Sequence, residues 1–307
     1  MRLDELKAML NITVPNCAEM DLQVSRKSLI DTFPIDPASI EINHLSTRHP
    51  SLRYQQMSQT LLYEQSVYKD WLASPTSSLL YLTGITSPEA CIKRPTTYSW
   101  LSPAAIYVAE QQSASEKSDD LCVYYNCHPS LSPDANVRHG SLELLGSIIW
   151  SVLRWKPAVL RHRWQHVKQG IEKAKSLRAE GDIRQSVKSM INLLKDVLIE
   201  AQKRTDNGFA YFVLDRLDQI DIKLRYLMDE LAHIVAVRDC KVKMFVVVDP
   251  AYAQGEWDLD MLDSEFRDRV LHQANWDQTR LPTYERIWNN AKKLGMDNGV
   301  DVADTKE

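Results

Sequence analysis

The strongest constraint on the fold of this chain is a set of four short apolar runs separated by longer stretches with helical spacing. The runs lie at 79–83, 121–126, 209–214 and 242–248. They are apolar throughout instead of alternating with polar residues, which is typical of strands buried on both faces. Strands of this kind that alternate with helices favour a three-layer α/β fold with a mainly parallel sheet. A fifth strand is predicted near 269–273, which gives a five-stranded sheet.

Apolar residues at helical spacing predict the helices between these strands. They are expected within 57–72, at 141–155, in two long patterns that end at the turn 206–208, at 224–235 and near 284–294. The second long pattern begins at Asp182, and Gln185 follows three residues later as in a capping box. The polar stretch 110–120 is predicted to be a surface loop. We expect an N-terminal arm at 1–58, one domain at 59–290 and a polar tail at 291–307.

Composition limits the classes of protein that remain. Hydrophobic residues make up 44% of the chain and charged residues 25%, so a sizeable core is expected. The net charge of −4 argues against a general nucleic-acid binder. The charged first residues indicate no secretory signal, and the longest apolar stretch is too short for a membrane span. Five scattered cysteines suggest a reduced, intracellular protein of the cytoplasm or nucleus.

Three strand ends are candidate ligand positions, because parallel α/β sheets bind ligands at the carboxyl ends of their strands. They are Gly84, Asp215 and Asp249. A glycine after the first strand can open a loop whose backbone N–H groups hold phosphates, and an aspartate at the end of a later strand can hold Mg²⁺. Together they form the outline of a P-loop NTPase.

Several segments resemble the NACHT-type (STAND) NTPase domain of large fungal signalling proteins. The likeness covers roughly residues 60–290. It comprises 67–72 and 79–84 as the approach to the Walker A glycine, 126–157 as the next strand and helix, 209–221 as the Walker B segment with Asp215 and Asp218, and 242–250 as the sensor strand. The resemblance implies that the sensor strand lies between the Gly84 strand and the Asp215 strand in one parallel sheet.

The phosphate-binding loop departs from that family. A Walker A loop that begins at Gly84 has Glu89, Ala90 and Cys91 where its second Gly, its Lys and its Ser or Thr are expected. The lysine charge and the hydroxyl that binds Mg²⁺ are therefore absent, and Glu89 would repel a triphosphate. Pro88 removes one N–H from the phosphate cradle.

Two further departures point the same way. Pro95 interrupts the helix that normally directs its N-terminus at the phosphates. The sensor strand ends in Asp249 and lacks the family's arginine. The sequence therefore predicts that this domain does not bind or hydrolyse ATP or GTP, and no cofactor is expected.

Simpler interpretations of these positions remain open. Gly84 is equally consistent with an ordinary strand-end turn. For Asp215 and Asp218, a helix N-cap followed by a solvated first turn is favoured over metal binding.

Two possible zinc sites are weak. His162 and His166 lie four residues apart on one helical face, but a solvated or packed face is favoured because no acidic zincin partner lies between them. Cys122, Cys127 and His128 lie around a strand end, where buried cysteines are the simpler interpretation. No metal site is expected.

A basic segment at 154–178 is the candidate interaction face. It holds eight Lys and Arg residues against one Glu, with Trp155 and Trp164 between them. Arg161, Arg163 and Lys168 are the candidate partner-binding residues. RNA binding is one alternative, and pairing with the acidic segment 256–268 is another.

The expected function is that of a non-catalytic pseudo-NTPase that acts as a protein-interaction scaffold or regulator. The alternatives are a nucleotide-binding or active STAND-type ATPase or GTPase, and an RNA-binding protein. The expected partner is a protein of unknown identity, with nucleic acid disfavoured.

Overall fold

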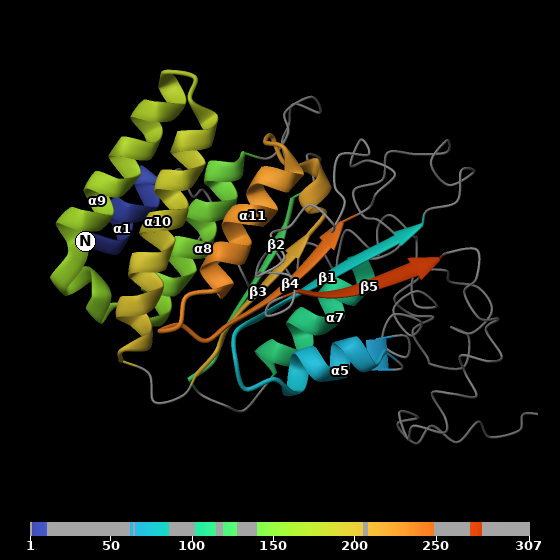
Figure 1. Ribbon diagram of the computed structural model, residues 1–307. Coiled ribbons are helices and arrows are strands. Elements are labelled where there is room, and N and C mark those ends of the chain that lie inside the picture. The colour runs from blue at the N-terminus through green and yellow to red at the C-terminus, as the bar shows by residue number, and fades with distance from the viewer. Residues whose placement is uncertain are drawn as a thin grey trace, which may run out of the picture.

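The computed structural model describes residues 2–10, 62–63, 65–85, 102–114, 119–127, 140–204, 208–248 and 271–277. Within these residues the chain is an α/β fold in which helices cover both faces of a parallel sheet (Figure 1). Among them, no helix is both long and apolar enough to cross a membrane.

The strands lie in the order β2 (Leu121–Asn126), β3 (Ala210–Asp215), β4 (Val242–Val248), β1 (Ser78–Ile85) and β5 (Leu271–Asp277). Every neighbouring pair is parallel. The four strands predicted at 79–83, 121–126, 209–214 and 242–248 do share one parallel sheet. The prediction that 242–248 lies between the Gly84 strand and the Asp215 strand is also confirmed. β3 and β4 are buried at every residue, which explains why their sequences are apolar except for Asp215 and Lys243.

One face of the sheet carries the larger core. It is covered by α8 (Ser141–Trp155), α10 (Ile183–Gln202) and α11 (Leu224–Val235), while α9 (Ala158–Ala179) and α1 (Arg2–Met9) pack outside them (Figure 1). Helix α8 has the predicted bounds. Asp182 caps α10 as predicted, because its Oδ1 accepts a hydrogen bond from the Gln185 backbone N–H at 3.1 Å.

The other face is covered by α5 (Ser66–Ala73) and α7 (Ser102–Ser113) (Figure 1). The predicted loop at 110–120 is wrong for 110–113, which are helical. Residues 104–109 are all buried, so α7 has no polar stripe from which helical spacing is recognised. Pro103 is its second residue, where a missing N–H breaks no helical hydrogen bond.

Helices α9 and α10 form an antiparallel hairpin. The chain turns between them at Gly181, which has φ of +86°, a conformation that glycine adopts without strain. At Gly170 an added Cβ would lie 3.0 Å from the Leu193 side chain, so the absence of a side chain lets the two helices approach closely. The Ser186 hydroxyl also donates to the Ala174 carbonyl across the pair at 2.6 Å.

Several predictions lie outside the described residues. They concern most of the arm at 1–58, the loop after β1, the helix near 284–294 and the tail at 291–307. The part of the arm that is described is α1, whose Leu6, together with the following Leu10, is buried in the larger core.

Candidate functional site

The carboxyl edge of the sheet brings the predicted Walker-like strands together. Gly84 lies inside β1, which runs on to Ile85, and it is in register with Trp276 of β5. It therefore belongs to the sheet instead of opening the loop. Glu89, Ala90 and Cys91 lie outside the described residues, as does Asp249, which follows the last residue of β4.

Asp215 is the last residue of β3, and its side chain is fully buried. Its Oδ2 accepts a hydrogen bond from the Tyr124 hydroxyl of β2 at 3.2 Å. Its backbone carbonyl accepts a hydrogen bond from the Cys127 N–H at 2.8 Å. The carboxylate is thus held between the ends of two neighbouring strands.

The next residue, Arg216, has φ of +59° and ψ of +43°, which is the left-handed region. This is unusual for a residue with a long side chain. The chain then makes a short 3₁₀ turn, η4 (Leu217–Gln219), and the Leu217 side chain enters the core. The sharp turn places the Arg216 side chain beside Asp218.

Arg216 and Asp218 form a buried, bidentate ion pair. Arg216 Nε lies 3.2 Å from both carboxylate oxygens of Asp218, and Nη2 lies 2.9 Å from Oδ2. Gln219 Nε2 donates to the same Oδ2 at 2.7 Å. The Arg216 and Asp218 side chains are 2% and 0% exposed, so the expected solvated first turn is wrong for Asp218.

The surroundings of this pair raise the pKa of neighbouring acidic groups. Burial raises the pKa of the Cys127 thiol well above its usual range, and the charges of Asp215 and Asp218 raise it further, whereas Arg216 lowers it. The pKa of the Tyr81 hydroxyl is also raised, chiefly by burial, with Asp218 contributing. The two carboxylates and the guanidinium therefore act on the same small region.

The residues present do not fit the Mg²⁺ ion that the P-loop resemblance implies. Both oxygens of Asp218 are already bonded to the Arg216 guanidinium, which places a fixed cation at the carboxylate. At the Walker A positions the loop sequence has Ala90 and Cys91 in place of the lysine and the hydroxyl of a nucleotide site. Throughout the part of the chain that is described, no group of three His, Cys, Asp or Glu residues is arranged to hold a metal ion.

Arg216 and Tyr124 were not predicted as site residues. A sequence signal for Arg216 did exist, because it stands directly between the strand-end Asp215 and the turn residue Asp218. Tyr124 carried no such signal, since it contacts Asp215 only through the pairing of β2 with β3.

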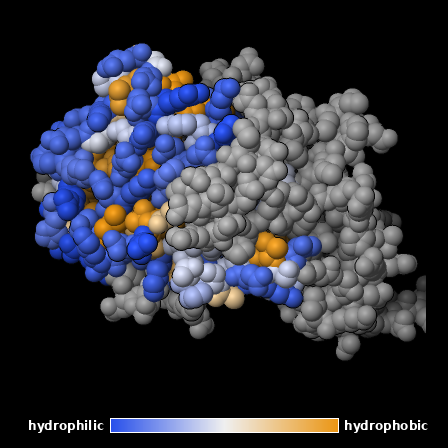
Figure 2. All heavy atoms as spheres, viewed as in Figure 1, coloured by the Kyte–Doolittle hydropathy of each residue, from blue (hydrophilic) through white to orange (hydrophobic). Residues whose placement is uncertain are grey.

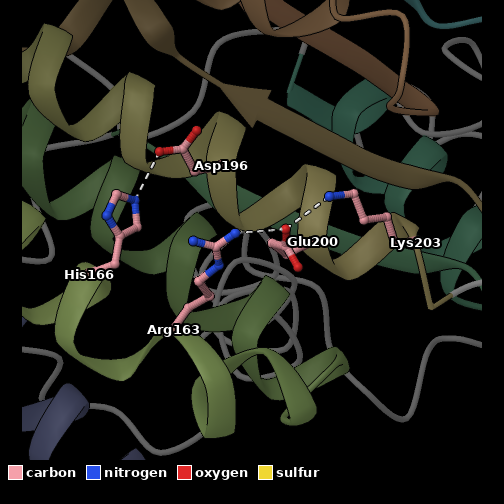
Figure 3. A network of polar contacts seen from close by, with 5 residues as sticks. All are labelled: Arg163, His166, Asp196, Glu200 and Lys203. Atoms are coloured by element: carbon pink, nitrogen blue, oxygen red, sulfur yellow. Dashed lines mark hydrogen bonds and ion pairs between the residues drawn. The ribbon is translucent and has the colours of Figure 1, made fainter.

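The candidate interaction face on α9 is divided between two sides of the helix. Arg163 points to α10, where its Nη2 lies 3.1 Å from Glu200 Oε1, and Lys203 bonds the same oxygen at 3.0 Å (Figure 3). At 100° per residue, Arg161 and Lys168 lie on another side of α9, well away from Arg163. Lys168 is 3.9 Å from Glu172 of the same helix. The three predicted partner-binding residues therefore do not form one patch.

The side of α9 that faces α10 is a polar network around a small hollow. His166 Nε2 lies 2.9 Å from Asp196 Oδ2, next to the Arg163–Glu200 pair (Figure 3). The hollow measures about 150 Å³, and Val159, Val197 and Ile199 also line it. The counter-charge to Arg163 thus comes from α10, while the acidic segment 256–268 lies outside the described residues.

The basic segment is also tied to the loop after η4. Arg178 Nη2 lies 2.5 Å from Asp221 Oδ2, and Asp221 Oδ1 accepts a hydrogen bond from the Ser141 N–H at 2.8 Å. Asp221 therefore joins the end of α9 to the start of α8.

The possible zinc sites are not assembled among the described residues. His166 is paired with Asp196, as described above. Cys122 packs on the α7 side of the sheet and Cys127 in the core on the opposite side, so their thiols face different layers. His128 lies outside the described residues.

No family model, no curated protein and no solved structure matches this chain.

Proposed function

We propose that this chain is a degenerate NACHT/STAND-type, P-loop NTPase-like domain that acts inside the cell as a non-catalytic scaffold or regulator. The observation that carries the proposal is the buried pairing of Asp218 with Arg216, beside the buried Asp215. In an active NTPase the strand-end carboxylate holds Mg²⁺ on the nucleotide. Here the strand-end Asp215 is buried and accepts a hydrogen bond from the Tyr124 hydroxyl, and Asp218 in the turn that follows is bonded to the chain's own guanidinium.

The order of the strands supports the P-loop part of the proposal. β4 lies between β1 and β3, as the resemblance implies for a sensor strand. The sequence after β1 supports the non-catalytic part. Glu89, Ala90 and Cys91 would leave a bound triphosphate without a lysine and would add a negative charge.

The proposed partner surface is the α9–α10 hairpin. Residues 158–202 carry nine Lys and Arg against five Asp and Glu, although the whole chain has a net charge of −4. Hydrophilic residues dominate this side of the molecule (Figure 2). An acidic surface on a protein partner would complement it.

RNA binding is less well supported than a protein partner. Non-specific binding of single strands relies on aromatic side chains that stack with bases. Trp155 and Trp164 are partly buried and pack against the larger core.

A nucleotide-binding assay tests the proposal. We expect Mg·ATP and Mg·GTP at millimolar concentration to leave the melting temperature unchanged, with no phosphate released above the rate without protein. A nucleotide present at a hundred times its Kd would stabilise the fold by about 2.7 kcal/mol, which corresponds to a rise of a few degrees. A rise that disappears in Asp215→Ala would favour the nucleotide-binding alternative instead.

A further inference from the structure

The turn after β3 combines two features that seldom occur together in one residue. Arg216 is 1% exposed and also adopts left-handed backbone angles. Left-handed residues other than glycine, asparagine and aspartate are held in place by their surroundings, and they gather at binding sites. The backbone here turns so that the guanidinium is directed onto Asp218, two residues further on.

The bonding resembles what a metal ion would otherwise provide. The guanidinium contacts both oxygens of the Asp218 carboxylate, and this pair lies at the same sheet edge as the buried carboxylate of Asp215. Buried carboxylates require a compensating cation or strong hydrogen-bond donors. An arginine stays protonated at any physiological pH, so its charge is permanent.

We propose that the Arg216 guanidinium is a built-in cation that takes the place of a divalent metal ion at the Asp218 carboxylate of this sheet edge. This inference rests on the proposed function, because the resemblance to P-loop NTPases is what assigns a metal ion to this edge. It goes further by naming the group that closes the edge to Mg²⁺. The device is internal to the turn and does not depend on the sequence of the loop after β1.

The test uses Mn²⁺ and the full chain, with Arg216→Gly as the main variant. Glycine accepts the left-handed backbone and removes the cation. The wild-type protein is expected to show no Mn²⁺-dependent change in melting temperature and no loss of the electron paramagnetic resonance signal of free Mn²⁺. For R216G, millimolar Mn²⁺ should raise the melting temperature by several degrees and reduce the free-Mn²⁺ signal. Adding Asp218→Asn to R216G should abolish both effects.

Arg216→Lys is the matched control. Lysine keeps the charge but cannot form the bidentate contact. We expect R216K to have a lower melting temperature than the wild type and to show no change in melting temperature on addition of Mn²⁺. If R216G does not fold alone, methylguanidinium or Mn²⁺ should restore folding, whereas methylammonium should do so less well.

Three outcomes would overturn the inference. The first is a wild-type protein that binds Mn²⁺ through Asp218. The second is a folded R216G that does not bind Mn²⁺. The third is an unfolded R216G whose folding is restored by neither methylguanidinium nor Mn²⁺. None of them bears on partner binding by α9 and α10. Conversely, a wild-type protein that binds Mg·ATP would contradict the proposed function whatever R216G does.

Discussion

Lys243 carries an amine into the interior of the sheet. It is the second residue of β4 and is 1% exposed. Its Nζ donates a hydrogen bond to the Trp71 carbonyl near the end of α5, and it lies 5.7 Å from the centre of the Trp71 ring and 5.5 Å from that of Phe209. Burial lowers the pKa of this amine to about 8. The free energy of unfolding should therefore depend on pH through this residue.

The direction follows from proton binding. The folded-state pKa lies below that of the unfolded chain, so between about pH 8 and 10 the unfolded state binds more protons and the Lys243 contribution to stability rises with pH. Lys243→Met removes this contribution while keeping most of the side-chain volume. We expect the free energy of unfolding of K243M, relative to wild type, to be higher at pH 7 than at pH 10, by on the order of 1–3 kcal/mol. Urea denaturation of both proteins at each pH measures this difference.

The difference in free energy of unfolding between K243M and wild type at each pH excludes the contributions of groups that titrate equally in both proteins. Burial raises the pKa of the Cys240 thiol to about 12, which lowers stability as pH rises above the thiol pKa of the unfolded chain. That effect is common to both proteins. A difference between K243M and wild type that stays constant from pH 7 to 10 would contradict the prediction.

At the scale of elements, α9 uses different sides for packing and for its remaining basic residues. The inward side of α9 is apolar, and its flank toward α10 is engaged in the Arg163–Glu200 and His166–Asp196 contacts. Arg161 and Lys168 lie on the remaining side. Reversing Arg163 together with these two, as the sequence alone suggests, would mix a packing effect with a binding effect.

We therefore predict different results for two sets of variants. Arg161→Glu with Lys168→Glu should abolish a partner contact and change the melting temperature little, because both residues lie away from α10. Arg163→Glu should lower the melting temperature slightly, since it removes an exposed ion pair and places two carboxylates together. Co-purification from the native source and thermal melting measure the two effects.

A matched control changes the net charge equally at other places. Lys69→Glu with Arg238→Glu alters α5, on the opposite face of the sheet, and the exposed segment between α11 and β4, both outside the α9–α10 hairpin. It should keep every co-purifying partner. If both double variants lose the partner, net charge is responsible. If neither loses it, this side of α9 is an ordinary solvated surface.

At the scale of the molecule, the sheet edge and the loop after β1 must both be suitable for a nucleotide to bind. We predict that Glu89→Gly, Ala90→Lys and Cys91→Ser, which rebuild the Walker A residues, will not restore binding of Mg·ATP. The sequence keeps Pro88 and Pro95, and Arg216 still occupies Asp218. The measurement is a thermal shift with Mg·ATP on the triple variant. If the triple variant binds Mg·ATP, the sequence of the loop after β1 alone prevents nucleotide binding in the wild type.

Much of the sheet could be predicted from the sequence. A strand buried on both faces is mostly apolar, so β1, β2, β3 and β4 were recognisable as nearly continuous apolar runs. Helix α8 and the Asp182 cap were recognisable because spacing and capping are local properties of the chain. Helix α7 was missed because burial of residues 104–109 removes the amphipathic pattern that identifies a helix.

The sequence by itself determined the class of fold and the departures from a Walker A motif after β1, because both depend on the order and type of neighbouring residues. Only the tertiary structure decided how the charges are used. Asp218 is buried against Arg216 because a left-handed residue reverses the chain at the end of β3, and the residue pattern does not reveal that angle. Arg163 is paired with Glu200 because α10 packs beside that side of α9, and a helical face gains such a partner only when another helix packs on it.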